Sequence, residues 1–555
     1  MRLLTSLYIF TILILLLPSF SFAAITAVNY TVGTIYSSEQ WSIIDVQFPA
    51  QENEPFDVEF GAKFDGPGGV TMRVPGFYNG DNLWTLRFSP PQPGDWAFTT
   101  YSSSPTLAGK SGAIRATVNK NPNKHGPIVL QKNNPQHFYH ADGTPYFVLA
   151  FEIDWLFALD AGNSTDIPKT RSIVKTMADH CYNQAVMNVY AHDVSWEKDQ
   201  NLKPEHEFGS PSVFPFGGSN DKPAHTTLNV EFFQRFDRVM HELDENGIVS
   251  HLMIYVWNKL VNWPEAHSKE DNRYFDYVVA RYQAFNNLIW DVSKEALGYG
   301  HDDMNYISER ISRIRKLDAY SRLITVHDYH YCSTHPEKVD FISIQTWSTP
   351  LYSQMKDIRE KYPKQPILNI EHGGYESSPY VVFPGDYNDP ITCLARNYEI
   401  IFAGCYSTYY WQGSAWNVII PDPFHLPKAQ QPRFDYYRNI RTLFDKYDFS
   451  TLKPVPGRQS SGLCLSDEQN VYIYYLPANN YATHISPPKH VKGSMKITWF
   501  NPLTGVFKDG GSEELGNWHE FKSPWLGQIA VLVLEAGKKL KAKKGNRSAH
   551  ISRDR

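Results

Sequence analysis

Cysteine is scarce in this sequence. Its 555 residues contain five cysteines, an odd number, and no two of them have the spacing of metal ligands. They are Cys181, Cys332, Cys393, Cys405 and Cys464. We therefore expect neither a disulfide framework nor a cysteine-bound metal, although one disulfide between an unassigned pair stays open. Cys181, Cys393 and Cys405 lie in apolar segments, which predicts that they are buried in the core.

Long apolar runs are absent beyond the N-terminus. The first segment combines a basic Arg2, an apolar stretch from Leu3 to Leu17 and the small-residue sequence Ser21-Phe22-Ala23. This order is typical of a secretory signal peptide over residues 1–23. The alternative is a membrane anchor, but the apolar stretch is short for a full span. We expect a secreted or periplasmic protein, with attachment to the cell surface as a further option, and no transmembrane span after signal cleavage.

Neither sign of charge is in large excess. Charged residues make up 20% of the chain and the formal net charge is −5, so the composition favours no nucleic-acid partner. Aromatic residues, by contrast, are abundant at 14%. Tryptophan and tyrosine rings suit the flat faces of sugars as well as protein cores. The length exceeds what one hydrophobic core usually contains, so we expect two or three domains.

Residues 24–120 have the pattern of an all-β domain. Trp84–Phe88 and Trp96–Thr99 alternate apolar and polar residues with the period of a half-buried strand. Turn-forming clusters separate such segments, for example Asp65-Gly66-Pro67-Gly68-Gly69. Short strands at this spacing predict a β-sandwich. The polar stretch Asn119–Pro127 is the expected linker to the next domain.

Residues 128–450 alternate short apolar strands with amphipathic helical stretches. Eight strands are predicted, at Tyr146–Ala150, Ala185–Tyr190, Ser250–Val256, Leu288–Val292, Leu323–Val326, Phe341–Thr346, Ile367–Ile370 and Cys405–Tyr410. The predicted helices are Ile173–Cys181, Val230–Glu245, Tyr274–Phe285, Ile307–Ala319, Met355–Tyr362, Thr392–Ala403 and a closing helix at Tyr436–Tyr447. Eight β/α units over roughly 320 residues have the number and size of a TIM barrel.

The pattern returns to β after the barrel. Residues 458–537 predict a second, smaller β-sandwich with strands at Val471–Leu476, Met495–Phe500 and Ile529–Leu534. Residues 538–555 are basic and polar, and we expect a disordered, solvated tail; contact with an anionic surface is the alternative. The predicted fold class is therefore α/β, a (β/α)8 TIM barrel flanked by N-terminal and C-terminal β-sandwich domains.

Two of the predicted barrel strands end in a glutamate. Glu295 follows the fourth strand, and Glu371 follows the seventh, just before His372 and a Gly-Gly break. The carboxyl ends of TIM-barrel strands carry catalytic groups. Glycoside hydrolysis uses two carboxylates, which in a retaining mechanism lie about 5–5.5 Å apart. Strands four and seven are close enough for that separation. The alternative for a lone strand-end glutamate is a salt-bridged rim residue. Asp291 is an alternative candidate for the catalytic acid, but the alternation of side chains along the strand places it further from the strand end than Glu295, inside the barrel.

The other strand ends supply polar and aromatic side chains that suit sugar hydroxyls and sugar faces. For each tryptophan the alternative is packing at the barrel rim. The candidate substrate-binding residues are Asp154, Trp155, His192, Trp257, His327, Tyr329, Gln345, Trp347, His372 and Trp411, with Glu152, Asp193, Asn258, Asp328, His330 and Gln412 beside them. The histidines match no metal-ligand spacing, so we predict no metal and no cofactor.

Three stretches carry a specific resemblance. They are the N-terminal Arg73-Val74-Pro75-Gly76-Phe77-Tyr78 and Pro93-Gly94-Asp95-Trp96, and the barrel opening Phe138-Tyr139-His140-Ala141-Asp142-Gly143-Thr144-Pro145-Tyr146-Phe147. With the two glutamates, the chain resembles glycoside hydrolase clan A and its apiosidase-like relatives. The N-terminal part resembles the uncharacterised β-sandwich that often precedes such barrels. The C-terminal part resembles the small sandwich, sometimes labelled collagen-binding-like, that often follows them. The resemblance implies that Glu295 is the general acid/base and Glu371 the nucleophile.

One residue departs from that family pattern. Clan A enzymes usually have an asparagine before the acid/base, which holds the sugar 2-hydroxyl, and this chain has Lys294. Three alternatives follow for Lys294. It points away from the substrate, it contacts an anionic group of the substrate, or the active site differs from that of the family. We therefore carry two hypotheses. The first is a secreted glycoside hydrolase, retaining in mechanism, that acts on a poly- or oligosaccharide. The second is a non-catalytic carbohydrate-binding or adhesion protein on an inactive barrel. The sugar, the linkage, endo or exo action and the oligomeric state stay open.

Overall fold

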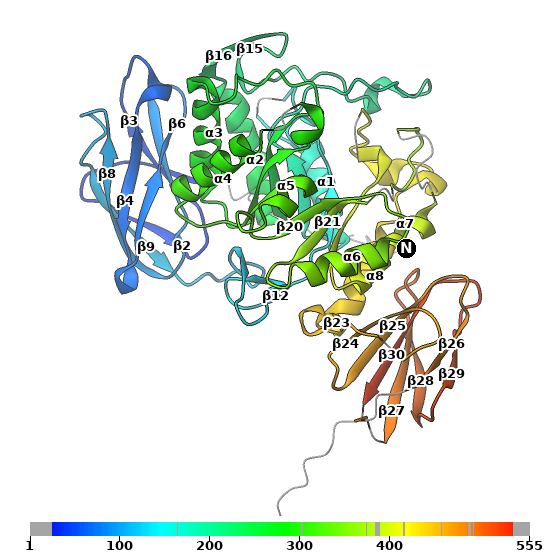
Figure 1. The fold of residues 1–555 in the computed structure, drawn as a ribbon. Helices are drawn as coiled ribbons and strands as arrows, with labels where there is room; N and C mark the ends of the chain where they lie inside the picture. The colour runs from blue at the N-terminus through cyan, green and yellow to red at the C-terminus, as the bar shows by residue number, and fades with distance from the viewer. Residues whose placement is uncertain are drawn as a thin grey trace, which may run out of the picture.

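The computed structural model describes residues 25–163, 165–300, 303–372, 375–382, 389–414, 417–456, 458–486, 490–491 and 493–536. The predicted signal peptide, the predicted tail and the Gly-Gly break at 373–374 lie outside these residues. The fold is α/β: a barrel of parallel strands with β-rich parts on either side, the N-terminal one in blue and the C-terminal one in orange and red (Figure 1). The predicted fold class is confirmed.

The barrel consists of eight parallel strands in the order β19-β18-β17-β14-β13-β22-β21-β20. Their bounds are β13 Ala150–Glu152, β14 Gln184–Asn188, β17 Val249–Val256, β18 Leu288–Lys294, β19 Ile324–His327, β20 Ile342–Gln345, β21 Ile367–Glu371 and β22 Tyr406–Tyr409. The first and last strands of this order meet where the Asp340 N–H donates to the Ile324 carbonyl at 2.8 Å. Because all strands run in parallel, their carboxyl ends open on one face.

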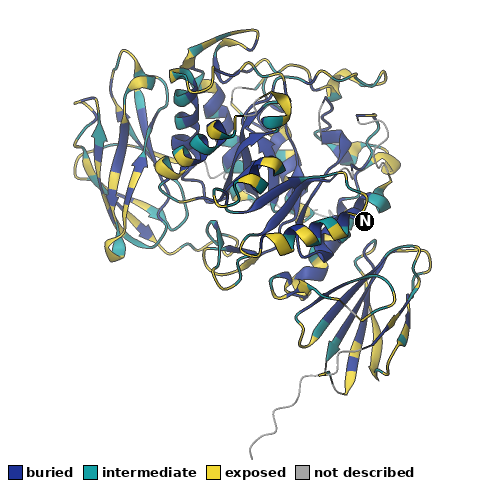
Figure 2. Ribbon diagram, in the orientation of Figure 1, coloured by how far each residue is buried: buried dark blue, intermediate teal, exposed yellow. Residues whose placement is uncertain are grey.

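Helices cover the outside of the barrel. They are α1 Pro168–Asp179, α2 Val230–Glu245, α3 Lys269–Tyr282, α4 Met304–Leu317, α5 Tyr329–Thr334, α6 Leu351–Lys361, α7 Pro390–Phe402 and α8 Phe434–Lys446. Side-chain caps start several of them: Asn229 accepts from the Phe232 N–H, Ser268 from Asp271 and Asp389 from Thr392. In Figure 2 the barrel strands are buried, whereas the helices around them are buried on one side and exposed on the other, as their amphipathic sequences require.

Two sheets form the N-terminal part. One has the order β1-β3-β7-β6 and the other β2-β9-β8-β4-β5. The strands are β1 Thr26–Asn29, β2 Ile35–Glu39, β3 Ile44–Pro49, β4 Phe60–Asp65, β5 Thr71–Pro75, β6 Phe77–Tyr78, β7 Leu83–Phe88, β8 Gly94–Ser102 and β9 Ser111–Thr117. Their shared core includes Trp84, Trp96 and a stacked pair, Phe64 on Phe88 at 3.9 Å between ring centroids. The alternating pattern of Trp96–Thr99 thus comes from one face that packs on the second sheet.

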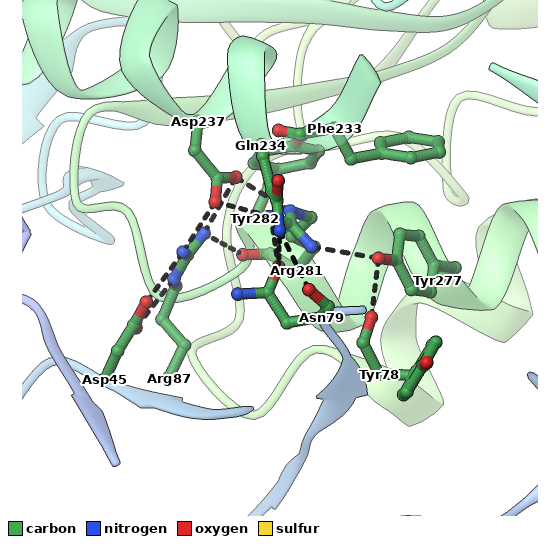
Figure 3. A network of polar contacts seen from close by, with 10 residues as sticks. All are labelled: Asp45, Tyr78, Asn79, Arg87, Phe233, Gln234, Asp237, Tyr277, Arg281 and Tyr282. Carbon is green, nitrogen blue, oxygen red and sulfur yellow. Dashed lines mark hydrogen bonds and ion pairs between the residues drawn. The ribbon is translucent and has the colours of Figure 1, made fainter. Parts of the chain in front are cut away.

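A buried charge network joins this sandwich to the barrel (Figure 3). Arg87 on β7 donates to Asp45 on β3 at 2.8 and 2.9 Å, and to Asp237 on α2 at 2.9 and 3.1 Å. Arg281 on α3 donates to the same Asp237 at 2.7 and 2.8 Å and to the Asn79 side chain at 2.9 Å. The two arginines and two aspartates balance each other in charge. Removing any one of them would leave a buried charge without its partner, which is strongly destabilising.

Replacing Asp237 with alanine is expected to lower the free energy of unfolding by about 3–5 kcal/mol, because two buried guanidinium groups lose their shared carboxylate. The matched control is Asp95→Ala, which removes an exposed partner of Arg115 and is expected to cost no more than about 1 kcal/mol. Denaturant unfolding of both variants measures the difference. Equal, small effects would show that this network does not hold the sandwich to the barrel.

The C-terminal part has a sheet of order β23-β24-β25-β30-β27-β28 and a second pair, β26-β29. The strands are β23 Lys453–Pro454, β24 Leu463–Ser466, β25 Val471–Leu476, β26 Ala482–Ile485, β27 Ser494–Phe500, β28 Phe507–Glu514, β29 His519–Lys522 and β30 Ala530–Ala536. Its core contains Tyr474, Trp499 and Phe521. The domain boundaries predicted above stay predictions.

The structure corrects the first predicted barrel strand and adds elements that were not predicted. The segment predicted as the first barrel strand is split: Pro145–Tyr146 is β12, in a separate sheet with β10 Ile128–Leu130 and β11 Phe138–His140, and β13 starts only at Ala150. The hairpin of β15 Phe216–Ser219 and β16 Lys222–Leu228 was not predicted, nor was the six-residue α5. Both are too short for a periodic apolar pattern.

A second correction concerns Cys181. It is exposed and has a positive φ of 63°, just past the end of α1, so the prediction that it is buried was wrong. Cys393 and Cys405 are buried, as predicted, and all five cysteines are free thiols. Within the described residues, no helix combines the length and apolarity that a membrane crossing requires.

Candidate active site

The end of β18 carries an irregularity that shapes the site. The register between β18 and β19 shifts between Asp291 and Lys294. Asp291 and Lys294 are three residues apart, so strict alternation would place them on opposite faces. Instead both are buried inside the barrel: Asp291 contacts His251 Nε2 at 2.9 Å, and Lys294 Nζ contacts Glu152 Oε1 at 2.6 Å. A bulge of this kind re-aims side chains next to active sites.

Glu295 comes directly after this bulge, and its backbone is strained. Its φ is 56°, in the left-handed region that non-glycine residues rarely adopt. Its N–H donates to the His327 carbonyl at 3.2 Å, which ties it to the neighbouring strand. Glu295 Oε2 accepts from Asn258 Nδ2 at 2.9 Å and Oε1 from Gln345 Nε2 at 3.1 Å. Both hydrogen bonds that the structure gives this carboxylate therefore come from neutral amides.

Glu371 ends β21 in a different environment. Its side chain is fully buried, with the Tyr375 hydroxyl donating to Oε1. Oε2 lies 3.7 Å from Lys294 Nζ and 3.4 Å from His327 Nε2. Burial alone would raise the pKa of this carboxyl, but the Lys294 ammonium, His327 and the Tyr375 hydroxyl together lower the pKa to about 2. Glu371 is therefore ionised at neutral pH.

The two glutamates converge. One carboxylate oxygen of Glu295, one of Glu371 and a ring nitrogen of His327 all lie within 4.8 Å of one another. Three oxygen- and nitrogen-bearing groups at this spacing can hold a divalent cation. Here the Lys294 ammonium lies against Glu371 and both Glu295 oxygens accept amide hydrogens, an arrangement that disfavours a cation. We assign no metal to these residues.

A cleft of about 480 Å³ opens in front of Glu295. Three strand-end loops supply its walls, after β18, β19 and β20. The lining residues are Glu295, Leu297, Gly298, Tyr299, His327, Asp328, Tyr329, His330, Gln345 and Trp347. Trp347 and Tyr299 are 41% and 51% exposed, which is unusual for large aromatic rings and suits stacking on a ligand.

Four of the ten residues named as substrate contacts lie at this cleft, beside the candidate catalytic Glu295. Glu295, His327, Tyr329, Gln345 and Trp347 all line this cleft. Asp328 also lines it, and caps α5 by accepting from the His330 N–H at 3.0 Å.

The other named residues lie elsewhere. Asp154 is fully buried below the mouth, 3.0 Å from Lys259 Nζ. His192 contacts the Tyr190 hydroxyl at 3.2 Å, and Trp257 stacks on Tyr255 at 5.7 Å between ring centroids. Both belong to the ends of β14 and β17, outside the lining of the cleft.

Three predicted contacts have almost no exposed surface. Trp155 stacks on Phe208 at 3.6 Å between ring centroids, because the loop after β14 folds over the barrel mouth. The Trp411 indole N–H donates to the Ser377 carbonyl at 3.1 Å, and His372 Nε2 lies 3.1 Å from the Thr408 carbonyl. In this structure these side chains pack instead of facing the cleft.

Two residues at the site, and one buried carboxyl in the loop after β21, were not predicted from the sequence. Tyr375 and Tyr299 were not named, although Tyr375 lies only four positions after Glu371, behind the Gly-Gly break. Glu376 is also absent from the prediction; burial raises its pKa to about 7. Its oxygens accept from the Arg433 N–H and the Tyr409 hydroxyl at 2.8 Å each, so it fastens the loop after β21.

Comparison with solved structures shows the same fold. A putative glycoside hydrolase from Bacteroides vulgatus superposes with a TM-score of 0.71 at 19% identity, over 90% of this chain and 100% of that one. A glycoside hydrolase family 5 protein from the same organism gives 0.57 at 16% identity, over 76% and 96%. No curated protein matches the sequence.

Two family models match the sequence itself. Residues 37–103 match a domain of unknown function, DUF5060, as the resemblance of the N-terminal sandwich implied. Residues 132–433, more than half of the chain, match the model described as apiosidase-like, catalytic domain. This chain therefore belongs to the family of proteins with an apiosidase-like catalytic domain.

Proposed function

We propose that the protein is an exported retaining glycoside hydrolase in which Glu371 is the nucleophile and Glu295 the general acid/base. The observation that carries the proposal is the pairing of two converging carboxylates in opposite environments. Glu371 is buried beside Lys294 and ionised, whereas Glu295 faces the cleft between two amides. One oxygen of Glu295 and one of Glu371 lie no more than 4.8 Å apart, which fits the short separation of retaining enzymes, about 5–5.5 Å, better than that of inverting enzymes, about 6.5–9.5 Å.

The reaction runs in two displacements. Glu371 attacks the anomeric carbon while the Glu295 carboxylic acid protonates the glycosidic oxygen, which leaves with its substituent. Glu295, now a carboxylate, then takes a proton from the water that attacks the glycosyl–Glu371 ester. Asn258 and Gln345 hold the Glu295 carboxyl in place through both steps. Each is a neutral amide donor, so its hydrogen bond can form whether Glu295 is protonated or ionised.

The cleft favours a neutral sugar. Among the described residues that line it there is no lysine or arginine. Lys294 has no exposed surface and lies against Glu152, so it offers no charge to an acidic substituent of a sugar in the cleft. We infer a neutral oligo- or polysaccharide, and apiose, after which the family is named, belongs among the sugars to test.

The test is a hydrolysis screen over neutral glycans and aryl glycosides, with matched uronides. We expect turnover of at least one neutral substrate with net retention at the anomeric carbon, and no turnover of the uronides. Turnover confined to uronides would overturn the neutral-substrate assignment alone. Saturable glycan binding without any hydrolysis would favour the second hypothesis, a carbohydrate-binding protein on an inactive barrel.

Replacing Trp347 with alanine is expected to raise KM for oligosaccharides about tenfold, the equivalent of about 1.4 kcal/mol of stacking. For an aryl glycoside too short to reach Trp347, KM should change little. Steady-state kinetics on the two substrates measure the effect. Trp518→Ala is the matched control, since Trp518 is also exposed but lies on the C-terminal sandwich; an equal effect there would place sugar binding outside the cleft.

A further inference from the structure

Lys294 occupies an unusual position beneath the cleft. It has no exposed surface, and its ammonium lies 2.6 Å from Glu152 Oε1 on β13 and 3.7 Å from Glu371 Oε2 on β21. The ammonium therefore bridges two strands that are separated by β22 in the barrel order. Burying such a charge is costly unless an anion and hydrogen bonds compensate it.

The two acidic partners of Lys294 are not equivalent. Burial raises the pKa of Glu152 well above its ordinary value. The charges of Asp154 and Glu371 raise this pKa further, whereas the Lys294 ammonium lowers it. The pKa of Glu371 moves the other way. Asp154 and Glu371, whose pKa values are both lowered, are the anions whose charges balance the ammonium, and Glu152 offers it an oxygen acceptor.

We propose that Lys294 is a positioning residue that keeps the Glu371 carboxylate ionised and fixed for attack, and that Glu152 anchors the Lys294 ammonium in turn. This inference rests on the proposed function and deepens it. Lys294 therefore neither points away from the site nor contacts the substrate. It lies beneath the cleft and supplies the fixed positive charge that keeps the buried Glu371 carboxylate ionised.

Other groups also face Glu371, and they set how large the effect can be. His327 on β19 and the Tyr375 hydroxyl favour the ionised form, while Glu295 opposes it. Tyr410, Tyr299 and His372 lie near enough to interact electrostatically, from the ends of β22, β18 and β21. The charge of Lys294 is the largest single cause that lowers the pKa of Glu371, and His327 lowers it both through a hydrogen bond and through its charge.

The decisive variant is Lys294→Met, which keeps most of the length of the side chain and removes its charge. Glu371 must be ionised to attack, so activity falls as the pH drops through the pKa of Glu371. Without Lys294, burial raises that pKa, and the acid limb of the kcat/KM profile is expected to move to higher pH by about 1–3 units. An acid limb that coincides with that of the parent protein would overturn the proposal.

Two further variants separate a specific effect from a general one. Lys259→Met removes a second fully buried ammonium, paired with Asp154 at 3.0 Å, and should leave the acid limb in place. Glu152→Gln retains an acceptor oxygen for Lys294 and should also leave it in place. A shift in Lys259→Met as large as in Lys294→Met would contradict the assignment, since Lys259 does not touch Glu371.

If Lys294→Met does not fold, the double variant Glu152→Leu/Lys294→Met replaces the buried polar pair with apolar groups, a change that buried ion pairs often tolerate. The same shift of the acid limb is expected in the double variant, and its absence would count equally against the proposal. Failure of the proposed function looks different: the parent protein itself would hydrolyse no glycan at any pH.

Discussion

Replacing Glu371 with glycine is expected to lower kcat by about 10⁴-fold or more, because the covalent step loses its nucleophile. Added azide should restore part of the activity by entering the space that the carboxylate leaves, and the glycosyl azide formed should have inverted configuration. The physical basis is the burial of Glu371 below the cleft, next to Lys294 and the Tyr375 hydroxyl. Kinetics with an aryl glycoside, followed by product analysis, measure both effects.

The matched control for this experiment is Glu376→Gln. Glu376 is also a buried carboxyl, five positions further along the chain, but its two oxygens accept from Arg433 and Tyr409. We expect this variant to lose stability and to keep kcat within a few-fold. A Glu371→Gly variant with near-normal kcat, or a Glu376→Gln variant with an equally large loss, would contradict the assignment of the nucleophile.

Replacing Glu295 with alanine is expected to lower kcat/KM by about 10²–10⁴-fold for substrates with poor leaving groups, which need a proton from the acid. An aryl glycoside with an activated leaving group needs no such proton, so its first step should stay fast. The second step should then be slow, and a burst of released phenol should precede it. Pre-steady-state measurement of phenol release on both substrate types gives the comparison.

Each substrate serves as the control for the other in that experiment. Equal losses on activated and unactivated substrates would show that Glu295 acts by holding the site together and does not transfer a proton. The contacts of Asn258 and Gln345 with the Glu295 carboxylate predict that Gln345→Ala reproduces a weaker version of the same selectivity, because the acid is then less well oriented.

The architecture was predictable because it depends on local patterns. Barrel strands that are buried on both faces contain continuous apolar runs, such as Leu252–Val256, and the helices between them have amphipathic periods and side-chain caps. The two glutamates were predictable for a related reason. A carboxylate at the end of a buried strand has no packing role, and the topology of the barrel brings strand ends to one face.

The details of the site depend on contacts between distant parts of the chain. Lys294 finds its acceptor in Glu152, 142 positions earlier, and no spacing in the sequence links the two. The bulge before Lys294 leaves no apolar signature either, so strict alternation was the best available prediction. Trp155 was assigned to the cleft because nothing in its neighbourhood reveals that Phe208, from a loop after the next strand, covers it.

The most direct measurement of the central claim is the trapping of the glycosyl–enzyme intermediate. A slow fluorinated glycoside of a sugar that the protein hydrolyses would be incubated with it, and the labelled peptide identified by mass spectrometry. The account predicts one sugar residue esterified to Glu371, and no label in Glu371→Gly. Hydrolysis with inverted product and no adduct, or an adduct on any other residue, would contradict it.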